Sequence, residues 1–157
     1  MGLKNKMYEL EGIEGRFFGK IFTFPARVYY EDTDAGGIVY YANYLRFAER
    51  ARTEYIRALG KNQVDDLNGD HKCGFVVKHC DIEYHKPAFL DDCLTITCEI
   101  IEIKGASAII YQQILRGDEL LAEVNIKAVY LDIDKKRPLR MPKDFLERID
   151  RLNKKEE

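Results

Sequence analysis

The chain has 157 residues, which is long enough for one domain with a buried core but short for two. Apolar residues make up 46% of it and charged residues 33%, a balance typical of globular rather than disordered proteins. The formal net charge of −2 gives no electrostatic reason to expect nucleic acid or an anionic membrane as a partner.

The sequence lacks the patterns of a membrane span, a leader and a cysteine-rich metal site. No apolar run approaches the roughly 20 residues that a spanning helix needs, and residues 1–20 lack the apolar block of a signal peptide. Cys73, Cys80, Cys93 and Cys98 form no Cys-x-x-Cys pair and lie in strand-like segments, so we expect reduced thiols and no metal. These features predict a cytoplasmic protein without a membrane span.

The first two elements are a strand and a long helix. Apolar and polar residues alternate over residues 21–30, which predicts a strand. From about residue 41 the apolar spacing becomes helical and continues to residue 59, and Gly60 follows where a helix commonly ends. We therefore predict one amphipathic helix over residues 41–59. Its apolar face consists of Tyr44, Phe47, Ala48, Ala51, Tyr55, Ala58 and Leu59.

The rest of the chain reads as a connecting loop, four strands and a short terminal helix. Residues 61–72 are polar and predict a loop with at most one short turn. Lys104-Gly105 and Arg116-Gly117-Asp118 mark tight turns between the later strands, and strands joined by turns this short must be antiparallel. The predicted strands cover residues 74–84, 93–103, 107–115 and 120–132, and the terminal helix covers residues 142–153.

These elements predict an α+β fold. About five antiparallel strands must bury one apolar face, and only one long helix is available to cover it, so a curled sheet wrapped around that helix is expected. We divide the chain into an N-terminal extension (residues 1–20), a single domain (residues 21–151) and a charged tail (residues 152–157).

The most informative segment is an acidic loop, residues 30–41, between the first strand and the long helix. Its Asp-x-Asp pair and two adjacent glycines also suit an ordinary turn, and an Asp before a helix is often only a cap. A calcium loop of the EF-hand kind needs an oxygen ligand at its fifth position and Glu at its twelfth. Counted from Asp32, these positions hold Gly36 and Asn43, which excludes a calcium loop. A phosphate loop needs Gly-x-x-x-x-Gly-Lys-Ser/Thr, which is absent. A phosphatase with an Asp nucleophile needs a parallel sheet with several helices, whereas this chain predicts antiparallel strands and one long helix.

Acyl transfer is the chemistry that remains. The glycines, Gly37 among them, would let a flat thioester carbonyl approach the backbone N–H groups of the helix start, around residues 41–44. These donors and the helix dipole would stabilise the negative charge that grows on the carbonyl oxygen. Asp34 would then act as a nucleophile or as a general base on water.

The residues around this loop resemble a known family. Residues 27–44, from Arg27-Val28-Tyr29-Tyr30 through Asp34-Ala35-Gly36-Gly37 to Asn43-Tyr44, resemble the active-site signature of hot-dog-fold acyl-CoA thioesterases. More narrowly, they are similar to the YbgC branch of the 4-hydroxybenzoyl-CoA thioesterase family. The likeness covers roughly residues 22–147 and includes residues 49–54, 82–92 and 104–107, Arg137-Pro138 and Pro142.

The resemblance implies a hot-dog fold and a particular site. Asp34 is implied as the acidic catalyst, with the thioester carbonyl bound near the helix start at Tyr41; Gly37 and Asn43 complete the expected substrate-binding set. It also implies a homo-oligomer, dimer or tetramer, with sites at the subunit interface, no metal, and no cofactor beyond the coenzyme A of the substrate. Because coenzyme A carries phosphates, Lys104 in a hairpin turn is a candidate phosphate contact, and a solvated surface lysine is the alternative.

Some residues leave alternatives open. Many YbgC-type sequences carry His where this chain has Tyr41, and Tyr cannot shuttle protons at neutral pH as His can. Proton transfer must then rely on Asp34 and water. Asp32 is expected to order the turn, and Asn43 either braces the helix start or contacts substrate. Glu54 on the helix is a rival catalyst known from another thioesterase branch, but that branch lacks the Asp of this signature.

The sequence thus predicts an acyl-CoA thioesterase that hydrolyses an acyl-CoA, or a related acyl thioester such as one on an acyl carrier protein, to the free acid. One alternative is a non-catalytic module on the same fold that binds acyl-CoA or an acyl carrier protein. A second is a hydratase or dehydratase, which needs a His with a carboxylate partner, and no His lies in or beside the signature. Neither the acyl group nor the choice between nucleophile and general base can be read from the residues.

Overall fold

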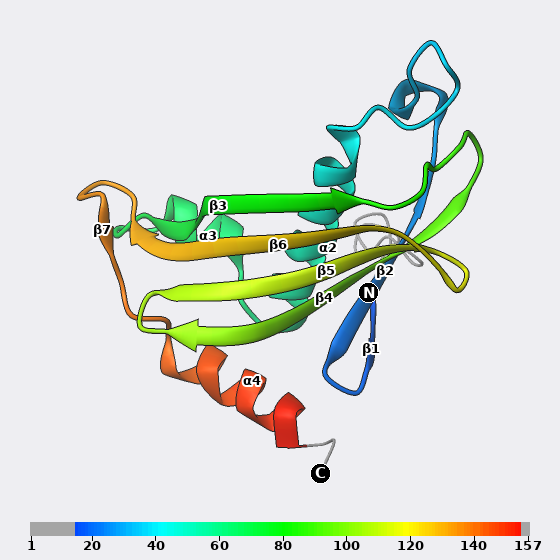
Figure 1. Ribbon diagram of the computed structural model, residues 1–157. Coiled ribbons are helices and arrows are strands. Elements are labelled where there is room, and N and C mark those ends of the chain that lie inside the picture. The colour runs from blue at the N-terminus through cyan, green and yellow to red at the C-terminus, as the bar shows by residue number, and fades with distance from the viewer. Residues whose placement is uncertain (1–14, 155–157) are drawn as a thin grey trace, which may run out of the picture.

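The computed structural model describes residues 15–154 and contains one antiparallel sheet of seven strands (Figure 1). In space the strands follow the order β1-β2-β4-β5-β6-β3, and β7 pairs with β6. The strands are β1 (Arg16–Phe18), β2 (Ile21–Arg27), β3 (Cys73–Tyr84), β4 (Cys93–Lys104), β5 (Ser107–Arg116), β6 (Glu119–Asp132) and β7 (Arg137–Pro138). The helices are the 3-10 turn η1 (Tyr30–Asp32), α2 (Asn43–Ala58), α3 (Gln63–Asn68) and α4 (Lys143–Lys154).

The antiparallel arrangement follows from tight turns at glycine. Gly105 between β4 and β5 has φ +63°, and Gly117 between β5 and β6 has φ +59°. Both lie in the left-handed region that residues with a side chain rarely adopt, which is why these two positions can reverse the chain within two or three residues. The predicted antiparallel connections are confirmed.

The core lies between one face of the sheet and α2. In β5 every second side chain from Ala108 to Ile114 is buried, and the apolar side of α2 packs against this row. Figure 1 shows α2 lying across one face of the sheet, with the opposite face free of helices in the part of the chain that the structure describes. The α+β prediction of one long helix packed on an antiparallel sheet is confirmed.

The structure differs from the sequence prediction at element ends and in three additional short elements, β1, α3 and β7. The first strand ends at Arg27 instead of residue 30, because residues 30–32 form the 3-10 turn η1. The long helix begins at Asn43, two residues later than predicted. Residues 63–68, expected in a loop, form the short helix α3, whose start is capped by the Asn62 side chain accepting a hydrogen bond from the Asp65 N–H.

Part of the predicted N-terminal extension packs on the domain. Residues 16–18 form β1, which pairs with β2, and the Phe17 ring lies 5.2 Å from that of Phe22 and 6.0 Å from that of Tyr55. At the other end, α4 continues to Lys154 and so passes the predicted boundary at residue 151. Residues 1–14 and 155–157 lie outside the described residues, and the division into extension, domain and tail stays a prediction.

Strand β3 forms one edge of the sheet. It pairs with β6 on one side, and no described strand pairs with its other side. Most of its side chains are exposed over a length of 12 residues, Val76 and Val77 included. An exposed edge of this length offers unpaired backbone groups to another chain.

None of the helices in residues 15–154 has the length and apolar character that crossing a membrane requires.

Candidate active site

The acidic loop is closed as a hairpin with Asp34 at its tip. The Asp34 N–H donates to the Ile38 carbonyl at 2.8 Å, and the Gly37 N–H donates to the Asp34 carbonyl at 3.0 Å. Thr33 and Val39 form an antiparallel bridge one step below the tip. Gly37 has φ +82°, so a residue with a side chain would be strained in this turn. The glycine therefore has a structural reason to be here, and its predicted contact with substrate stays a prediction.

Asp32 and Asn43 hold the base of this hairpin. The Asp32 carbonyl accepts hydrogen bonds from the Tyr40 N–H at 2.9 Å and from the side-chain amide of Asn43 at 3.0 Å. The Asp32 carboxylate accepts from the Tyr29 N–H at 2.8 Å. Both side chains are buried. Asp32 thus has the ordering role expected of it, and Asn43 braces the helix start; a contact of Asn43 with substrate stays a prediction.

The Asp34 carboxylate is exposed to solvent beside a hollow. Its Oδ1 accepts one hydrogen bond, from the Gly36 N–H at 2.8 Å. A hollow of about 410 Å³ lies here, and its lining consists of Tyr30, Thr33, Asp34, Ala35, Gly37 and Leu90. The structure therefore brings Asp34 and Gly37 to one hollow but does not bring Tyr41, Asn43 or Lys104 into its lining. The turn that holds Lys104 lies at the opposite end of the sheet from the acidic loop (Figure 1).

The start of α2 has free backbone donors. The residue before the helix is Ala42, and no side chain caps this end. The Asn43 N–H donates to the Tyr40 carbonyl at 2.8 Å. Within residues 15–154, the N–H groups of Tyr41 and Ala42 make no hydrogen bond. These two amides, at the positive end of the helix dipole, can donate hydrogen bonds to a carbonyl oxygen.

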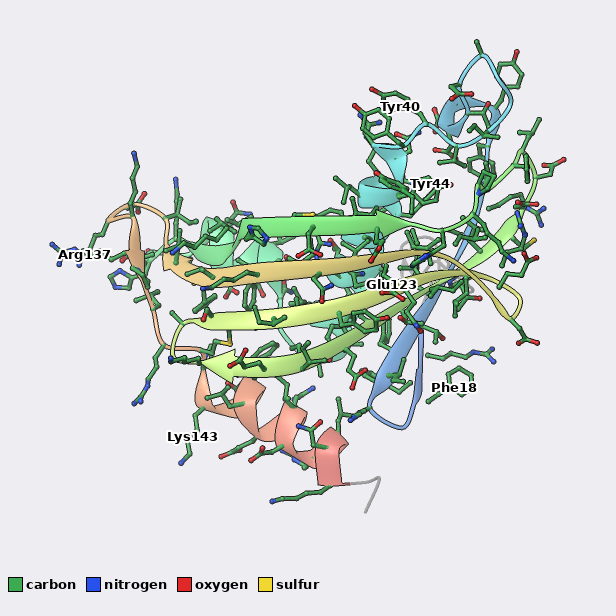
Figure 2. The ribbon with its side chains drawn as sticks, viewed as in Figure 1. Phe18, Tyr40, Tyr44, Glu123, Arg137 and Lys143 are labelled. Atoms are coloured by element: carbon green, nitrogen blue, oxygen red, sulfur yellow. The ribbon has the colours of Figure 1, made fainter. Side chains whose placement is uncertain are left out.

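A group of tyrosines surrounds this helix start. The Tyr84 hydroxyl, at the end of β3, donates to the Tyr41 carbonyl at 2.7 Å. The Tyr84 ring lies edge-on to those of Tyr41 and Tyr44, with centroid distances of 6.5 and 5.4 Å. Figure 2 shows Tyr40 and Tyr44 at the end of α2 that adjoins the acidic loop. Tyr84 was missed in the sequence, since its role depends on which strand lies beside the helix start.

A second loop, residues 85–92, fixes the acidic loop from the side. The Val39 N–H donates to the Ala88 carbonyl at 2.9 Å, and the Val28 N–H donates to the Asp92 carbonyl at 2.9 Å. The Asp92 carboxylate in turn accepts from the Arg116 guanidinium at 2.7 Å. Partial burial opposes the ionisation of Asp92, but the Phe89 N–H and Arg116 outweigh it and lower the pKa of this carboxyl. Two segments about 55 residues apart are thus fixed to one another at the site.

One group of side chains has metal-binding donors. Ligand atoms of Glu83, His85 and Glu123 lie within 4.8 Å of one another. Glu123 points away from the face that α2 covers (Figure 2), so these donors lie across the sheet from Tyr84 and α2. They are exposed or half-exposed, and carboxylates beside a His are common on surfaces without an ion, so we assign no metal to them.

The fold and the loop geometry define a class of protein. Residues 28–149 match the family model described as the thioesterase-like superfamily, and the chain belongs to this family. One sheet around one helix is the hot-dog fold, and a solved structure agrees: that of a probable thioesterase from Bartonella henselae superposes with a TM-score of 0.74 at 37% identity, covering 78% of this chain and 99% of that one. The predicted hot-dog fold is confirmed.

Named relatives narrow the class. The chain is 46% identical over 123 residues to the acyl-CoA thioesterase YbgC of Haemophilus influenzae, covering 78% of this chain and 90% of the relative. It is 42% identical over 127 residues to the acyl-CoA thioester hydrolase YbgC of Escherichia coli O157:H7, covering 80% and 93%. The resemblance to the YbgC family that the sequence suggested is therefore confirmed.

Proposed function

We propose that this chain is a thioester hydrolase that converts an acyl-CoA, or a related acyl thioester, to the free acid and coenzyme A. The observation that carries the proposal is the arrangement of the acidic loop. It presents the Asp34 carboxylate at a hairpin tip and leads directly into a helix start where the N–H groups of Tyr41 and Ala42 have no partner within the described residues. The YbgC relatives, which carry the same activity in their names, support it.

The helix start would bind the carbonyl oxygen of the thioester. As the tetrahedral intermediate forms, negative charge grows on this oxygen, and backbone N–H donors stabilise it; losing one such donor typically costs about 3 kcal/mol. Gly37 carries no side chain that would obstruct the acyl group. Loss of the C–S bond then releases coenzyme A as its thiol.

Asp34 would start the reaction by one of two routes, and in both its step precedes the loss of the C–S bond. In the first, its carboxylate attacks the thioester carbon, and water opens the resulting mixed anhydride. In the second, it takes a proton from a water molecule that attacks the same carbon. The Tyr41 phenol is no proton shuttle at neutral pH, so the protons pass through Asp34 and water in both routes. No cofactor besides the coenzyme A of the substrate takes part.

The working form is proposed to be a homo-oligomer with sites at the subunit interface. In one protomer Asp34 and Tyr41 are open to solvent, and the apolar side chains around them are exposed as well: Tyr30, Ile38, Phe89 and Leu90. A second copy that pairs along the free edge of β3 would cover apolar surface and exclude water from the thioester. A dimer is the smallest such assembly, and a tetramer would be two of them.

Lys104 of one protomer is proposed to bind a phosphate of the coenzyme A whose thioester lies at Asp34 of the other protomer. Strand β4 begins beside the acidic loop and ends at Lys104, the last of its 12 residues. At about 3.3 Å per residue, Lys104 lies roughly 36 Å from the start of that strand. This separation is too long for a contact with a phosphate bound near Asp34 of the same protomer.

We also place the protein in the cytoplasm. Its four cysteines are all free thiols, as expected in a reducing compartment.

The test is the release of free thiol from a panel of short-chain, long-chain and aromatic acyl-CoAs. Asp34→Asn should lower kcat by about 100- to 10,000-fold, as expected for loss of a general base or nucleophile, without a change in melting temperature. Asp118→Asn is the matched control, since it removes an equivalent charge from the exposed β5–β6 turn. The tyrosines around the helix start predict turnover of at least one apolar acyl group.

Undiminished turnover by Asp34→Asn would remove the central claim. Tight binding of acyl-CoA by the wild-type protein with no thiol release from any substrate would favour the binding module.

A further inference from the structure

We propose that Tyr84 is a positioning residue for thioester hydrolysis. Its hydroxyl holds and polarises the Tyr41–Ala42 peptide group, so that the Ala42 N–H binds the thioester oxygen together with the Tyr41 N–H. This inference rests on the proposed function and adds to it a residue of β3 that acts on one of the two donors.

The geometry of the peptide group links Tyr84 to Ala42. The carbonyl of Tyr41 and the N–H of Ala42 are two ends of one planar unit and point in opposite directions. The Tyr84 hydroxyl donates to this carbonyl at 2.7 Å. A hydrogen bond accepted by the carbonyl of a peptide group fixes the direction of the N–H in the same group and makes this N–H a stronger donor. The Ala42 N–H therefore points away from Tyr84 and is a better donor because of it.

The preceding peptide group is held in the same way. The Tyr40 carbonyl accepts from the Asn43 N–H at 2.8 Å, and the same planar unit carries the Tyr41 N–H. In residues 15–154, neither this N–H nor that of Ala42 has a hydrogen-bond partner, and no side chain caps this helix end. Two consecutive amides with bonded carbonyls and free N–H groups form a pair of donors for one oxygen atom.

Tyr84 is itself well placed to act as a fixed donor. It lies at the end of β3, directly opposite Ala122 in the ladder with β6, and its ring packs against Tyr41 and Tyr44. Tyr44 is anchored in turn, since its hydroxyl accepts the Ala88 N–H at 2.9 Å. Partial burial, helped by the nearby phenols, raises the pKa of Tyr84, so its hydroxyl keeps its proton at neutral and mildly alkaline pH.

Tyr84→Phe tests the role, because it removes the hydroxyl and keeps the ring. We expect kcat to fall by about 10- to 100-fold, less than the loss of a whole donor, since the Ala42 N–H remains but is neither held nor polarised. KM should change less than about threefold, because the donors act mainly on charge that develops in the transition state. Tyr111→Phe is the matched control: it removes a phenol from the sheet face away from α2 and should leave kcat unchanged.

A second measurement reads the donors directly and needs no turnover. In an Asp34→Asn background, the infrared stretch of a ¹³C-labelled thioester carbonyl should lie at lower frequency when bound than when free. Adding Tyr84→Phe should move the bound frequency back toward the free value, and adding Tyr111→Phe should not.

The outcomes separate this inference from the proposed function. An unchanged kcat and an unchanged carbonyl frequency in Tyr84→Phe would overturn the positioning role while leaving hydrolysis by Asp34 intact. A fall in kcat matched by a lower melting temperature and the wild-type carbonyl frequency would also overturn it, because the bond would then serve only stability. If the wild-type protein hydrolyses no thioester, the proposed function fails, and the carbonyl frequency still decides whether Tyr84 polarises the bound group.

Discussion

Gln112 is a fully buried polar side chain whose hydrogen bonds tie the long helix to the sheet. Its amide nitrogen donates to the Ala48 carbonyl at 3.0 Å and to the Cys98 sulfur at 3.1 Å, and its oxygen accepts from the Arg52 guanidinium at 2.8 Å. Arg52, buried as well, also pairs with the exposed Glu49 on the same helix. Burial raises the pKa of the Cys98 thiol to about 12, so it stays neutral in this network. Every polar group that folding buries here thus has a partner.

Gln112→Ala should therefore be strongly destabilising. It leaves a cavity and removes the partner of a buried guanidinium, which together should lower the free energy of unfolding by about 2 to 4 kcal/mol. Urea unfolding at neutral pH measures this. Gln113→Ala is the control on the opposite face of the same strand, where about 1 kcal/mol or less is expected. Equal decreases in the free energy of unfolding of the two variants would show that the buried hydrogen bonds of Gln112 add no stability.

Residues whose roles depend on a local motif were predictable, and residues whose partners come from another strand were not. Asp34, Gly37 and Asp32 belong to one short hairpin, so their types and spacing indicated an acidic turn that Asp32 orders, while the catalytic role of Asp34 stays a prediction. Tyr84 and Gln112 read only as strand residues, because the register of β3 and β5 decides what they meet. Asn43 had two possible roles, and only its contact with the Asp32 carbonyl shows the bracing one.

Strand β3 has a long edge that no strand of residues 15–154 covers. It is 12 residues long and carries no proline within it. The interruption of its pairing with β6, between Val77 and His79, leaves long segments on either side that could pair with a second copy. Val77, 48% exposed on this edge, would be buried by such pairing.

Val77→Asp should then weaken the oligomer. A charge placed in the pairing edge should raise the dissociation constant at least about tenfold, and activity per protomer should fall in parallel at low protein concentration. Sedimentation velocity and thiol release at matched concentrations measure both. Phe18→Asp is the control, because Phe18 is 65% exposed on β1, at the opposite end of the sheet from β3. If Val77→Asp sediments and turns over like wild type, the β3 edge is not the interface.

The periodicity of apolar residues predicted the types of the longer elements. The ends of these elements depend on individual contacts, which periodicity does not describe. The helical spacing placed α2 correctly, but its first turn is tightened by the bond from the Asn43 N–H to the Tyr40 carbonyl, which shifts the start by two residues. Helix α3 is six residues long and has no buried residue, so it has no apolar pattern to detect. The strand β1 has three residues, too few for an alternation to be recognised.

One whole protomer alone would leave the proposed active site incomplete. The acidic loop and the start of α2 lie at one end of the sheet, and the β4–β5 turn, which holds the proposed phosphate contact Lys104, lies at the other (Figure 1). Two copies related by a twofold axis bring opposite ends together, which a single copy cannot do. The stability of the fold and the completeness of the site should therefore depend on the same association.

Thermal unfolding should depend on protein concentration for this reason. If a folded dimer unfolds to two chains, each tenfold dilution lowers the free energy of unfolding by about 1.4 kcal/mol per dimer. The melting midpoint should fall by a few degrees between roughly 100 and 1 μM protein, measured by circular dichroism in cells of different path length. A midpoint that stays constant over this range would indicate a protomer that is stable alone.

Ala42 has a consequence for attempts to make this protein more stable. Ser, Thr, Asp and Asn are the common residues at a helix start, and each is worth about 1 kcal/mol there relative to Ala. The chain lacks that gain, since Ala42 has no side-chain oxygen to cap the N–H groups of the first helical turn. Thermostability engineering that scores caps would choose this position early, and a cap oxygen there would accept from the N–H groups of the first helical turn and place negative charge beside the Tyr41 and Ala42 amides. A cap at position 42 would therefore raise stability and, under the proposed function, lower activity.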